Sequence, residues 1–151
     1  MDASIRLAKL EDLPGILALY CELRPNDPRL LEVDAQALLS NLVANPCISL
    51  IVCECEGILA STCMLAIVPN LASAGSPFGV IEHVVTLAQY RRRGLGRMVL
   101  QFALDRAWTQ GCYKVILLSG AGRADAHKLY ESVGFKGDVE RGFVAKPKNA
   151  A

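Results

Sequence analysis

The sequence contains no C-x-x-C pair and only two histidines, His83 and His127. Its six cysteines are scattered, and the nearest two, Cys53 and Cys55, flank a glutamate inside an apolar segment. Structural metal sites need several such ligands at compatible spacing, so we expect no bound metal. Reduced thiols in hydrophobic segments are typical of small buried side chains and of a reducing compartment. We therefore expect a cytoplasmic protein.

Long apolar runs and a charge imbalance are also missing. No segment reaches the roughly 18 apolar residues of a membrane-spanning helix. The N-terminal MDASIRLAKLEDL lacks the basic start and apolar run of a signal peptide. Sixteen basic and 15 acidic residues leave a formal net charge of +1, which argues against a dedicated nucleic-acid-binding protein. We expect neither a membrane nor a nucleic acid as a partner.

What the sequence does contain is enough apolar material for one core. Hydrophobic residues make up 52% of the 151 residues, and a chain of this length usually forms a single domain. We therefore expect one domain over residues 1–151.

Hydrophobic periodicity and turn residues predict alternating strands and helices. The predicted strands cover residues 5–9, 48–55, 58–68, 80–87 and 113–118, with one or two more from residue 135 onward, including 140–146. The predicted helices cover residues 11–23, 34–45, 94–110 and 124–133. Asp34 is the expected N-cap of the second helix, and Glu56-Gly57 the expected hairpin turn. Hairpins mixed with a crossover predict a mixed α/β (α+β) sheet with helices on both faces.

The stretch QYRRRGLGR, residues 89–97, lies between the strand over 80–87 and the helix that begins near Gly94. A glycine-rich loop that enters a helix presents unpaired backbone N–H groups at the positive end of the helix dipole. Such a site suits a diphosphate. The G-x-G-x-x-G and Walker A patterns are absent, which argues against the Rossmann and P-loop nucleotide sites. The local alternative is a basic connection that contains two glycines by chance.

Residues 91–96, RRRGLG, resemble the R/Q-x-x-G-x-G/A signature of GCN5-related N-acetyltransferases, the GNAT superfamily. The segment IEHVV (81–85) resembles the strand before that signature. GCYKVIL (111–117) and LYESVGF (129–135) resemble the strand and helix that follow it, at matching spacing.

The resemblance covers residues 4–145 and is most specific over residues 80–136. Within the superfamily, the G-C-Y-K run is similar to glucosamine-6-phosphate N-acetyltransferases and their bacterial relatives. Ser119 stands where those enzymes end the strand with an aspartate, which weakens the sugar-phosphate interpretation.

The resemblance implies a GNAT-type sheet, mostly antiparallel, in which the strands at 82–85 and 113–118 splay apart. It implies acetyl-CoA as co-substrate, with the diphosphate on the loop amides and the pantetheine arm beside the first of these strands. The acetyl-CoA-binding core would cover residues 80–136, and the acceptor side residues 10–79. The residues implied at coenzyme A are Val84, Val85, Arg91, Arg92, Arg93, Gly94, Leu95, Gly96, Arg97 and, at a position where many members carry asparagine, Arg123.

Acyl transfer to an amine needs a neutral amine, a polarised thioester carbonyl and a proton for the leaving thiolate. The resemblance implies Tyr130 as the general acid. Glu82 is the implied base, acting directly or through water, and His83 is the alternative base. On a regular strand these two side chains face opposite ways unless a bulge intervenes. A core-packing tyrosine and a solvent-facing glutamate are the corresponding non-catalytic interpretations.

These observations lead us to expect an N-acetyltransferase that acts directly on a primary amine of a small molecule. A protein or peptide acceptor is one alternative, and a non-catalytic acyl-CoA-binding regulatory module is another. Many superfamily members pair through the sheet edge or C-terminal strands, so residues 139–146 are the expected contact of a possible homodimer.

Overall fold

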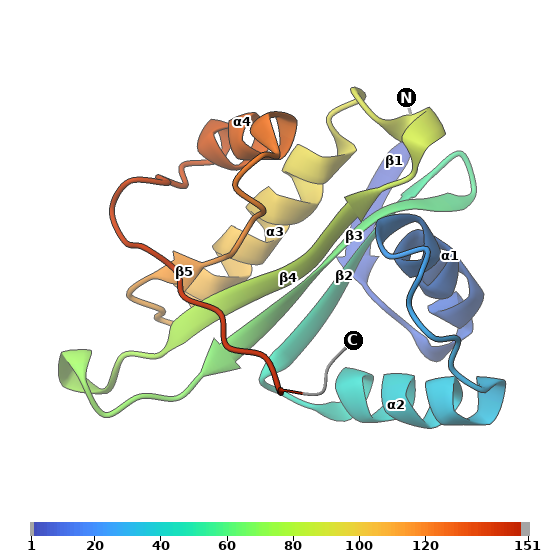
Figure 1. The fold of residues 1–151 in the computed structure, drawn as a ribbon. Coiled ribbons are helices and arrows are strands. Elements are labelled where there is room, and N and C mark those ends of the chain that lie inside the picture. The colour runs from blue at the N-terminus through green and yellow to red at the C-terminus, as the bar shows by residue number, and fades with distance from the viewer. Residues whose placement is uncertain (1, 149–151) are drawn as a thin grey trace. The chain divides into compact units, whose positions relative to one another are not determined.

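The computed structural model describes residues 2–148 of the chain. These residues form two compact units, one up to Leu117 and one from Leu118 onward. The first unit contains a five-stranded sheet and three α-helices, and the second contains one α-helix followed by a segment without regular secondary structure (Figure 1).

The sheet has the strand order β1-β2-β3-β4-β5. Its strands are β1 (Ala3–Leu7), β2 (Ile48–Cys55), β3 (Ile58–Val68), β4 (Phe78–Thr86) and β5 (Val115–Ile116). The first four strands are antiparallel neighbours, and β5 is parallel to β4. The predicted mixed, mostly antiparallel sheet is confirmed. The strand predicted over residues 113–118 is much shorter, because only Val115 and Ile116 are paired, and both are half-buried.

The predicted hairpin between β2 and β3 is confirmed. Its two turn residues, Glu56 and Gly57, have φ values of 55° and 78°. Two consecutive left-handed residues form the type of turn whose twist matches that of the flanking strands. The local sequence therefore specifies the turn, and the register shifts by one residue between Glu54 and Cys53 of β2.

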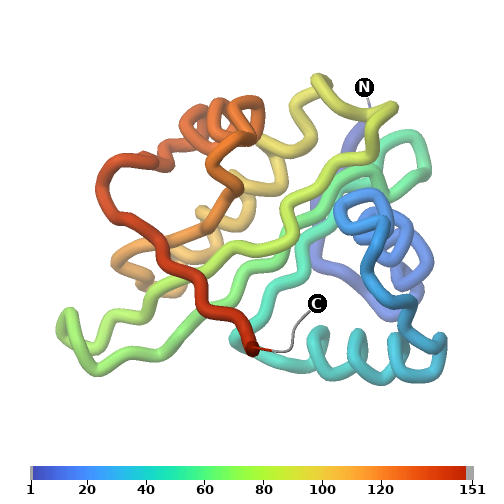
Figure 2. Tube along the Cα trace, viewed as in Figure 1, coloured from blue at the N-terminus to red at the C-terminus, as the bar shows by residue number. Residues whose placement is uncertain are grey.

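The helices follow the predicted order. They are η1 (Leu10–Asp12), α1 (Leu13–Leu23), α2 (Glu32–Ala44), η2 (Ser73–Gly75), η3 (Ala88–Tyr90), α3 (Leu95–Thr109) and α4 (Ala124–Ser132). The loop between β3 and β4 extends beyond the end of the sheet (Figure 2). Within residues 2–148, no helix combines the length and apolar character that crossing a membrane requires.

The start of α2 differs from the prediction. The N-cap residue is Leu31, with extended backbone, and Asp34 lies inside the first turn. An acidic side chain is favourable there too, because it faces the positive end of the helix dipole. The prediction that Asp34 lies at the start of this helix is correct, but its assignment as the N-cap residue is wrong.

Both faces of the sheet are covered by helices, as predicted (Figure 1). On one face, residues from α1, α2 and β2 form a buried cluster, which includes Leu13, Leu39 and Val52 and receives Met64 of β3 at its edge. On the other face, α3 packs against the sheet, and the Cys63 thiol lies 3.5 Å from the carbonyl oxygen of Val99. Neighbouring residues of β3 thus serve two separate cores, as the alternation of a strand requires.

In the second unit, α4 is the single regular element between residues 118 and 148. The strands predicted from residue 135 onward, including 140–146, are wrong for this structure. Val139, Phe143 and Val144 are 69%, 88% and 69% exposed. Apolar and β-branched residues favour a strand only when a neighbouring strand takes up their backbone hydrogen bonds.

An ion pair ties the first strand to the first helical turn. The two terminal guanidinium nitrogens of Arg6, Nη1 and Nη2, donate to the Asp12 carboxylate at 2.6 and 2.9 Å. The backbone N–H of Lys9 donates to the same carboxylate at 2.7 Å. Asp12 is only 7% exposed, and the Arg6 hydrogen bonds hold its pKa below the usual range. The buried carboxylate is therefore fully partnered.

Asp12→Asn should lower the free energy of unfolding by about 2 kcal/mol at neutral pH, because it removes the buried negative charge that accepts hydrogen bonds from Arg6. Because the pKa of Asp12 is lowered in the folded state, its carboxylate stabilises the fold fully at pH values above the unfolded-state pKa, which is near 4. This contribution is lost as the pH falls through the pKa of the folded state. Urea unfolding of the wild type and of Asp12→Asn, measured from pH 7 to pH 3, should therefore give free energies of unfolding whose difference becomes smaller on acidification.

The matched control for Asp12 is Glu11→Gln, because the Glu11 side chain is 77% exposed and lies 4.0 Å from its nearest cation, Lys9. This change should cost less than about 0.5 kcal/mol. An Asp12→Asn effect that is no larger than the control, or that does not depend on pH, would contradict the structural role of the ion pair.

Candidate functional site

A β-bulge interrupts β4 at its centre. The register with β3 shifts by one residue, so that His83 and Val84 lie opposite the single residue Cys63. His83 has a φ of 56°, in the left-handed region that non-glycine residues seldom occupy but histidine enters more often than most. Bulges re-aim side chains and are frequent beside functional sites.

The bulge brings Glu82 and His83 to the same face of the sheet. Glu82 is the cross-strand partner of Met64, which packs against the cluster below α1 and α2. The His83 ring lies 5.5 Å from the Tyr20 ring of α1. On a regular strand the two neighbours would face opposite ways. Both side chains are half-buried on this face.

Tyr20 supports this group from α1. Burial, and secondarily the proximity of Cys63, raises the pKa of the Tyr20 phenol to about 12. The phenol is therefore protonated at neutral pH and available as a hydrogen-bond donor. The sequence pattern does not distinguish Tyr20, because its spacing within the helix is that of an ordinary core residue.

One edge of β4 is largely unpaired. Only Gly79 and Val80 pair with β5, and the two strands separate beyond that point (Figure 1). Within residues 2–148, no strand pairs with that edge from Ile81 to Thr86. The splayed strand pair implied by the resemblance is confirmed. Such an edge presents backbone donors and acceptors to an extended ligand.

The unpaired edge leads into the start of α3. Gly94 is the N-cap residue, with a φ of 83° that favours glycine. The first backbone hydrogen bond of the helix runs from the N–H of Met98 to the carbonyl oxygen of Gly94, at 3.1 Å. The N–H groups of Leu95, Gly96 and Arg97 precede it and have no acceptor within the helix. They form a positive end suited to an anion.

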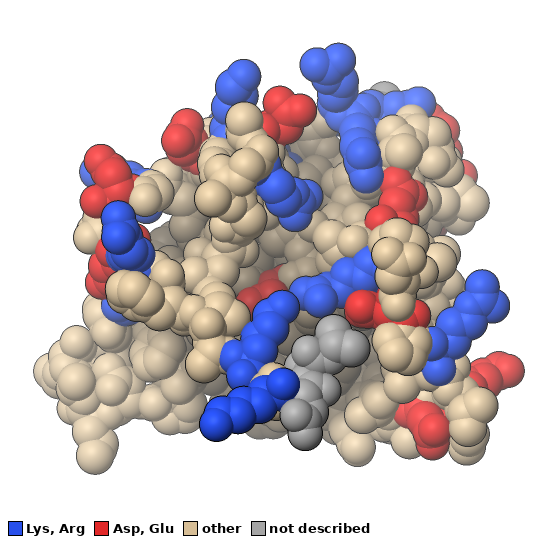
Figure 3. All heavy atoms as spheres, viewed as in Figure 1, with Lys and Arg blue, Asp and Glu red and all other residues tan. Residues whose placement is uncertain are grey.

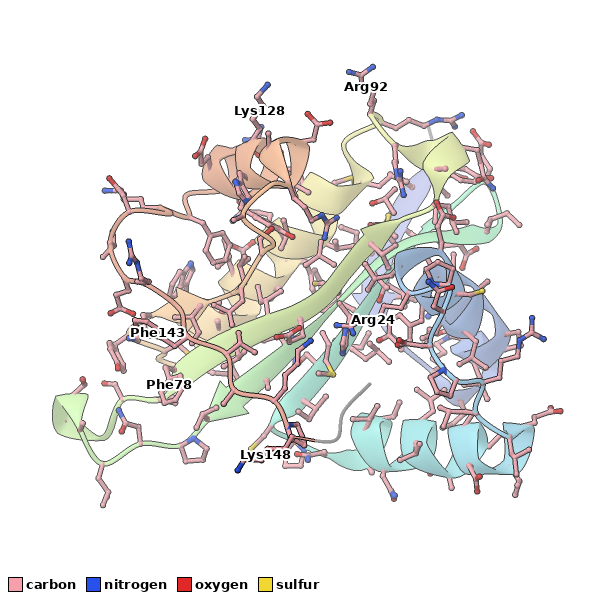
Figure 4. The ribbon with its side chains drawn as sticks, viewed as in Figure 1. Arg24, Phe78, Arg92, Lys128, Phe143 and Lys148 are labelled. Atoms are coloured by element: carbon pink, nitrogen blue, oxygen red, sulfur yellow. The ribbon has the colours of Figure 1, made fainter. Side chains whose placement is uncertain are left out.

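The arginines of the loop before α3 have different surroundings. Arg91 pairs with Glu22 of α1 at 3.1 Å. Arg93 pairs with Glu56 of the β2–β3 turn at 3.5 Å and lies over the Tyr90 ring. Arg92 is exposed and points away from the fold in Figure 4. The sequence suggested one basic cluster, but the structure divides it into two paired arginines and one exposed arginine.

In the second unit, Tyr130 is buried on α4, and its ring meets the Phe135 ring edge-on at a centroid distance of 6.3 Å. Arg123 is the N-cap residue of α4. The Nε2 of His127 lies 2.9 Å from the carbonyl oxygen of Gly120, so the imidazole joins the helix to the loop before it.

Charge and metal ligands are distributed without large clusters. Acidic and basic side chains are interspersed on the face shown in Figure 3, consistent with the net charge of +1. Among residues 2–148, no three His, Cys, Asp or Glu side chains lie close enough together to hold a metal ion. The chemical groups near β4 are thus a carboxylate, an imidazole, a phenol and unpaired backbone amides.

Comparison with known proteins gives consistent results. The sequence pattern of the Acetyltransferase (GNAT) family matches residues 13–135. A glucosamine 6-phosphate N-acetyltransferase of Trypanosoma brucei brucei is 34% identical over 80 residues, which cover 53% of this chain and 52% of that protein. This match therefore spans about half the length of that relative.

Two further matches cover most of the chain. An L-methionine sulfoximine/L-methionine sulfone acetyltransferase of Pseudomonas aeruginosa is 32% identical over 143 residues, covering 90% of this chain and 81% of that protein. The solved structure of a putative acetyltransferase from Agrobacterium tumefaciens is 41% identical, with a TM-score of 0.90. It covers 95% of this chain and 99% of that chain.

Proposed function

Because this chain belongs to the acetyltransferase (GNAT) family, we propose that it transfers the acetyl group of acetyl-CoA directly to a primary amine of a small molecule. The observation that carries this proposal is the continuous path from the unpaired edge of β4 to the open amides of α3. The family pattern spans both units of the chain, which supports a single acetyltransferase domain.

Coenzyme A matches this path in the order of its parts. The pantetheine arm has two amide groups and can pair with the edge of β4 as an added strand, next to Val84 and Val85. The diphosphate then reaches the N–H groups of residues 95–97, where the helix dipole favours its charge. Arg92, and Arg123 of the second unit, add positive charge for the phosphates.

The transfer is a single displacement. The amine nitrogen attacks the thioester carbonyl carbon, the carbon–sulfur bond breaks, and the sulfur leaves as a thiolate. Glu82 takes the amine proton directly or through water, with His83 on the same face as the alternative base. Backbone N–H groups at the β4 edge polarise the carbonyl oxygen. Tyr130 donates the proton that the thiolate requires.

A small acceptor is favoured by the names of the relatives. The Trypanosoma relative is named as an acetyltransferase of a sugar phosphate. The Pseudomonas relative is named as an acetyltransferase of methionine derivatives. The match to the second covers much more of this chain. Ser119 in place of an aspartate also disfavours the sugar phosphate. We therefore propose an amine of amino-acid size, bound on the side of the sheet that carries α1 and α2.

The function is tested by measuring thiol release from acetyl-CoA with a panel of small amines, including amino acids, amino sugars and polyamines. Peptides with free N-termini and lysines form a separate arm. At least one small amine should give protein-dependent release. Release with peptides alone would redirect the proposal to a protein acceptor, and binding of acetyl-CoA without release would indicate a regulatory module.

In the same assay, Tyr130→Phe should lower kcat by about 100-fold, because the thiolate loses its proton donor. The change keeps the ring that packs on Phe135. The dissociation constant for acetyl-CoA, measured by calorimetry, should change by less than about twofold, since the β4 edge and the α3 amides that bind most of coenzyme A are unchanged. Unchanged kcat would assign Tyr130 a packing role alone.

Glu82→Gln and His83→Asn separate the two candidate bases. Glu82→Gln should lower kcat/KM for the amine by about 100-fold, because the carboxylate can no longer accept the proton. His83→Asn should have a much smaller effect, since asparagine also tolerates the left-handed backbone of the bulge. Both are measured as kcat/KM against pH, and the reverse order of effects would identify His83 as the base.

Gly96→Val should weaken acetyl-CoA binding by at least about 30-fold, or roughly 2 kcal/mol, because a branched side chain obstructs the backbone amides. Arg92→Ala should weaken it by less than about fivefold, because an exposed charge contributes little. Calorimetry gives both affinities. Circular dichroism shows whether Gly96→Val still folds, and Gly96→Ala provides a smaller side chain at the same buried position. Strong loss in the arginine variant and none in Gly96→Val would refute recognition by the backbone.

A further inference from the structure

Glu22, near the end of α1, joins that helix to the turn between β4 and α3. One oxygen of its carboxylate, Oε1, accepts a hydrogen bond from the backbone N–H of Ala88 at 2.6 Å. The same oxygen accepts a second one from Nη2 of Arg91 at 3.1 Å. Ala88 begins η3, and Arg91 follows its last residue. A single side chain of α1 therefore binds both ends of this short turn.

Arg91 extends the connection to the strand. Its Nε donates to the carbonyl oxygen of Thr86, the last residue of β4, at 3.1 Å. The guanidinium thus bridges α1 and the end of β4, and only three residues separate Arg91 from the first residue of α3. Its charge is already partnered by Glu22. Arg91 is consequently better suited to shaping the loop than to binding phosphate with its side chain.

These contacts lie where they matter more for loop position than for stability. The side chains of Glu22 and Arg91 are 27% and 58% exposed, and ion pairs open to solvent contribute little to the stability of the whole fold. The distance of a diphosphate from the helix amides, by contrast, depends directly on where the turn places Gly94. Charge-assisted hydrogen bonds are well suited to such positioning.

We propose that Glu22 is a positioning residue for acetyl-CoA. It holds the turn before α3 in the conformation that opens the helix amides to the diphosphate. This inference rests on the proposed function. It assigns to the acceptor-side helix α1 a role in cofactor binding, which no motif of the loop itself indicates.

The test compares two donors of the acetyl group. S-acetylpantetheine carries the thioester arm but no diphosphate, so it depends on the β4 edge and not on the amides of α3. Glu22→Ala should raise KM for acetyl-CoA by about tenfold and change kcat by less than about twofold. It should leave KM for S-acetylpantetheine within about twofold of the wild type. A structural defect would impair both donors equally.

The matched variants are Glu22→Gln and Glu32→Ala. The glutamine retains an oxygen for the Ala88 N–H but loses the ion pair, so KM for acetyl-CoA should lie between those of the wild type and Glu22→Ala. Glu32 is an exposed carboxylate of α2, and its removal should have no effect on either donor. The midpoint of thermal unfolding should shift by less than about 4 °C in all three variants.

Two failures remain distinguishable. If the wild type binds and uses acetyl-CoA while Glu22→Ala has the same KM for both donors as the wild type, the role of Glu22 is refuted and the proposed function stands. Equal impairment with both donors would also refute positioning of the diphosphate loop. If the wild type neither binds acetyl-CoA nor releases thiol, the proposed function itself fails.

Discussion

The unequal pairing of β4 is the constraint on which the rest of the site depends. Along one edge the strand is paired with β3 over almost its full length, whereas along the other it pairs with β5 at two residues only. A paired strand is held rigidly, and an unpaired edge still offers backbone hydrogen bonds. The two properties together allow a fixed strand to accept an extended ligand without any rearrangement of the sheet.

The bulge at His83 adds side chains to this backbone site. Without it, the alternation of the strand would direct Glu82 and His83 to opposite faces. The shift in register against β3 brings both to the side covered by α1, where Tyr20 meets the imidazole. A left-handed backbone at a non-glycine residue costs free energy. The surrounding pairing of β3 and β4 supplies the stability that keeps it in place.

The positive groups near α3 are of two kinds: arginines that are paired with carboxylates, and backbone amides that have no acceptor within the helix. Arg91 and Arg93 are held by carboxylates from α1 and from the β2–β3 turn. The helix amides carry no such partner within the helix. Two of the three arginines in the loop before α3 are therefore paired, and Arg92 is exposed. Much of the basic character is neutralised locally and serves the conformation of the loop.

The sequence by itself determined the family, the order of the elements and the loop at the start of α3, because these depend on local patterns. Glu56-Gly57 specifies its turn, and Gly94 specifies the start of a helix through its own backbone freedom. The sequence did not reveal the bulge, the pairing of Glu22 with Arg91 or the absence of strands over residues 135–148. Each of these depends on partners distant in the chain: Cys63 opposite His83, α1 beside the loop, and a neighbouring strand for residues 140–146. Local pattern predicts what a segment can form, and only tertiary structure decides whether its hydrogen-bonding partner is there.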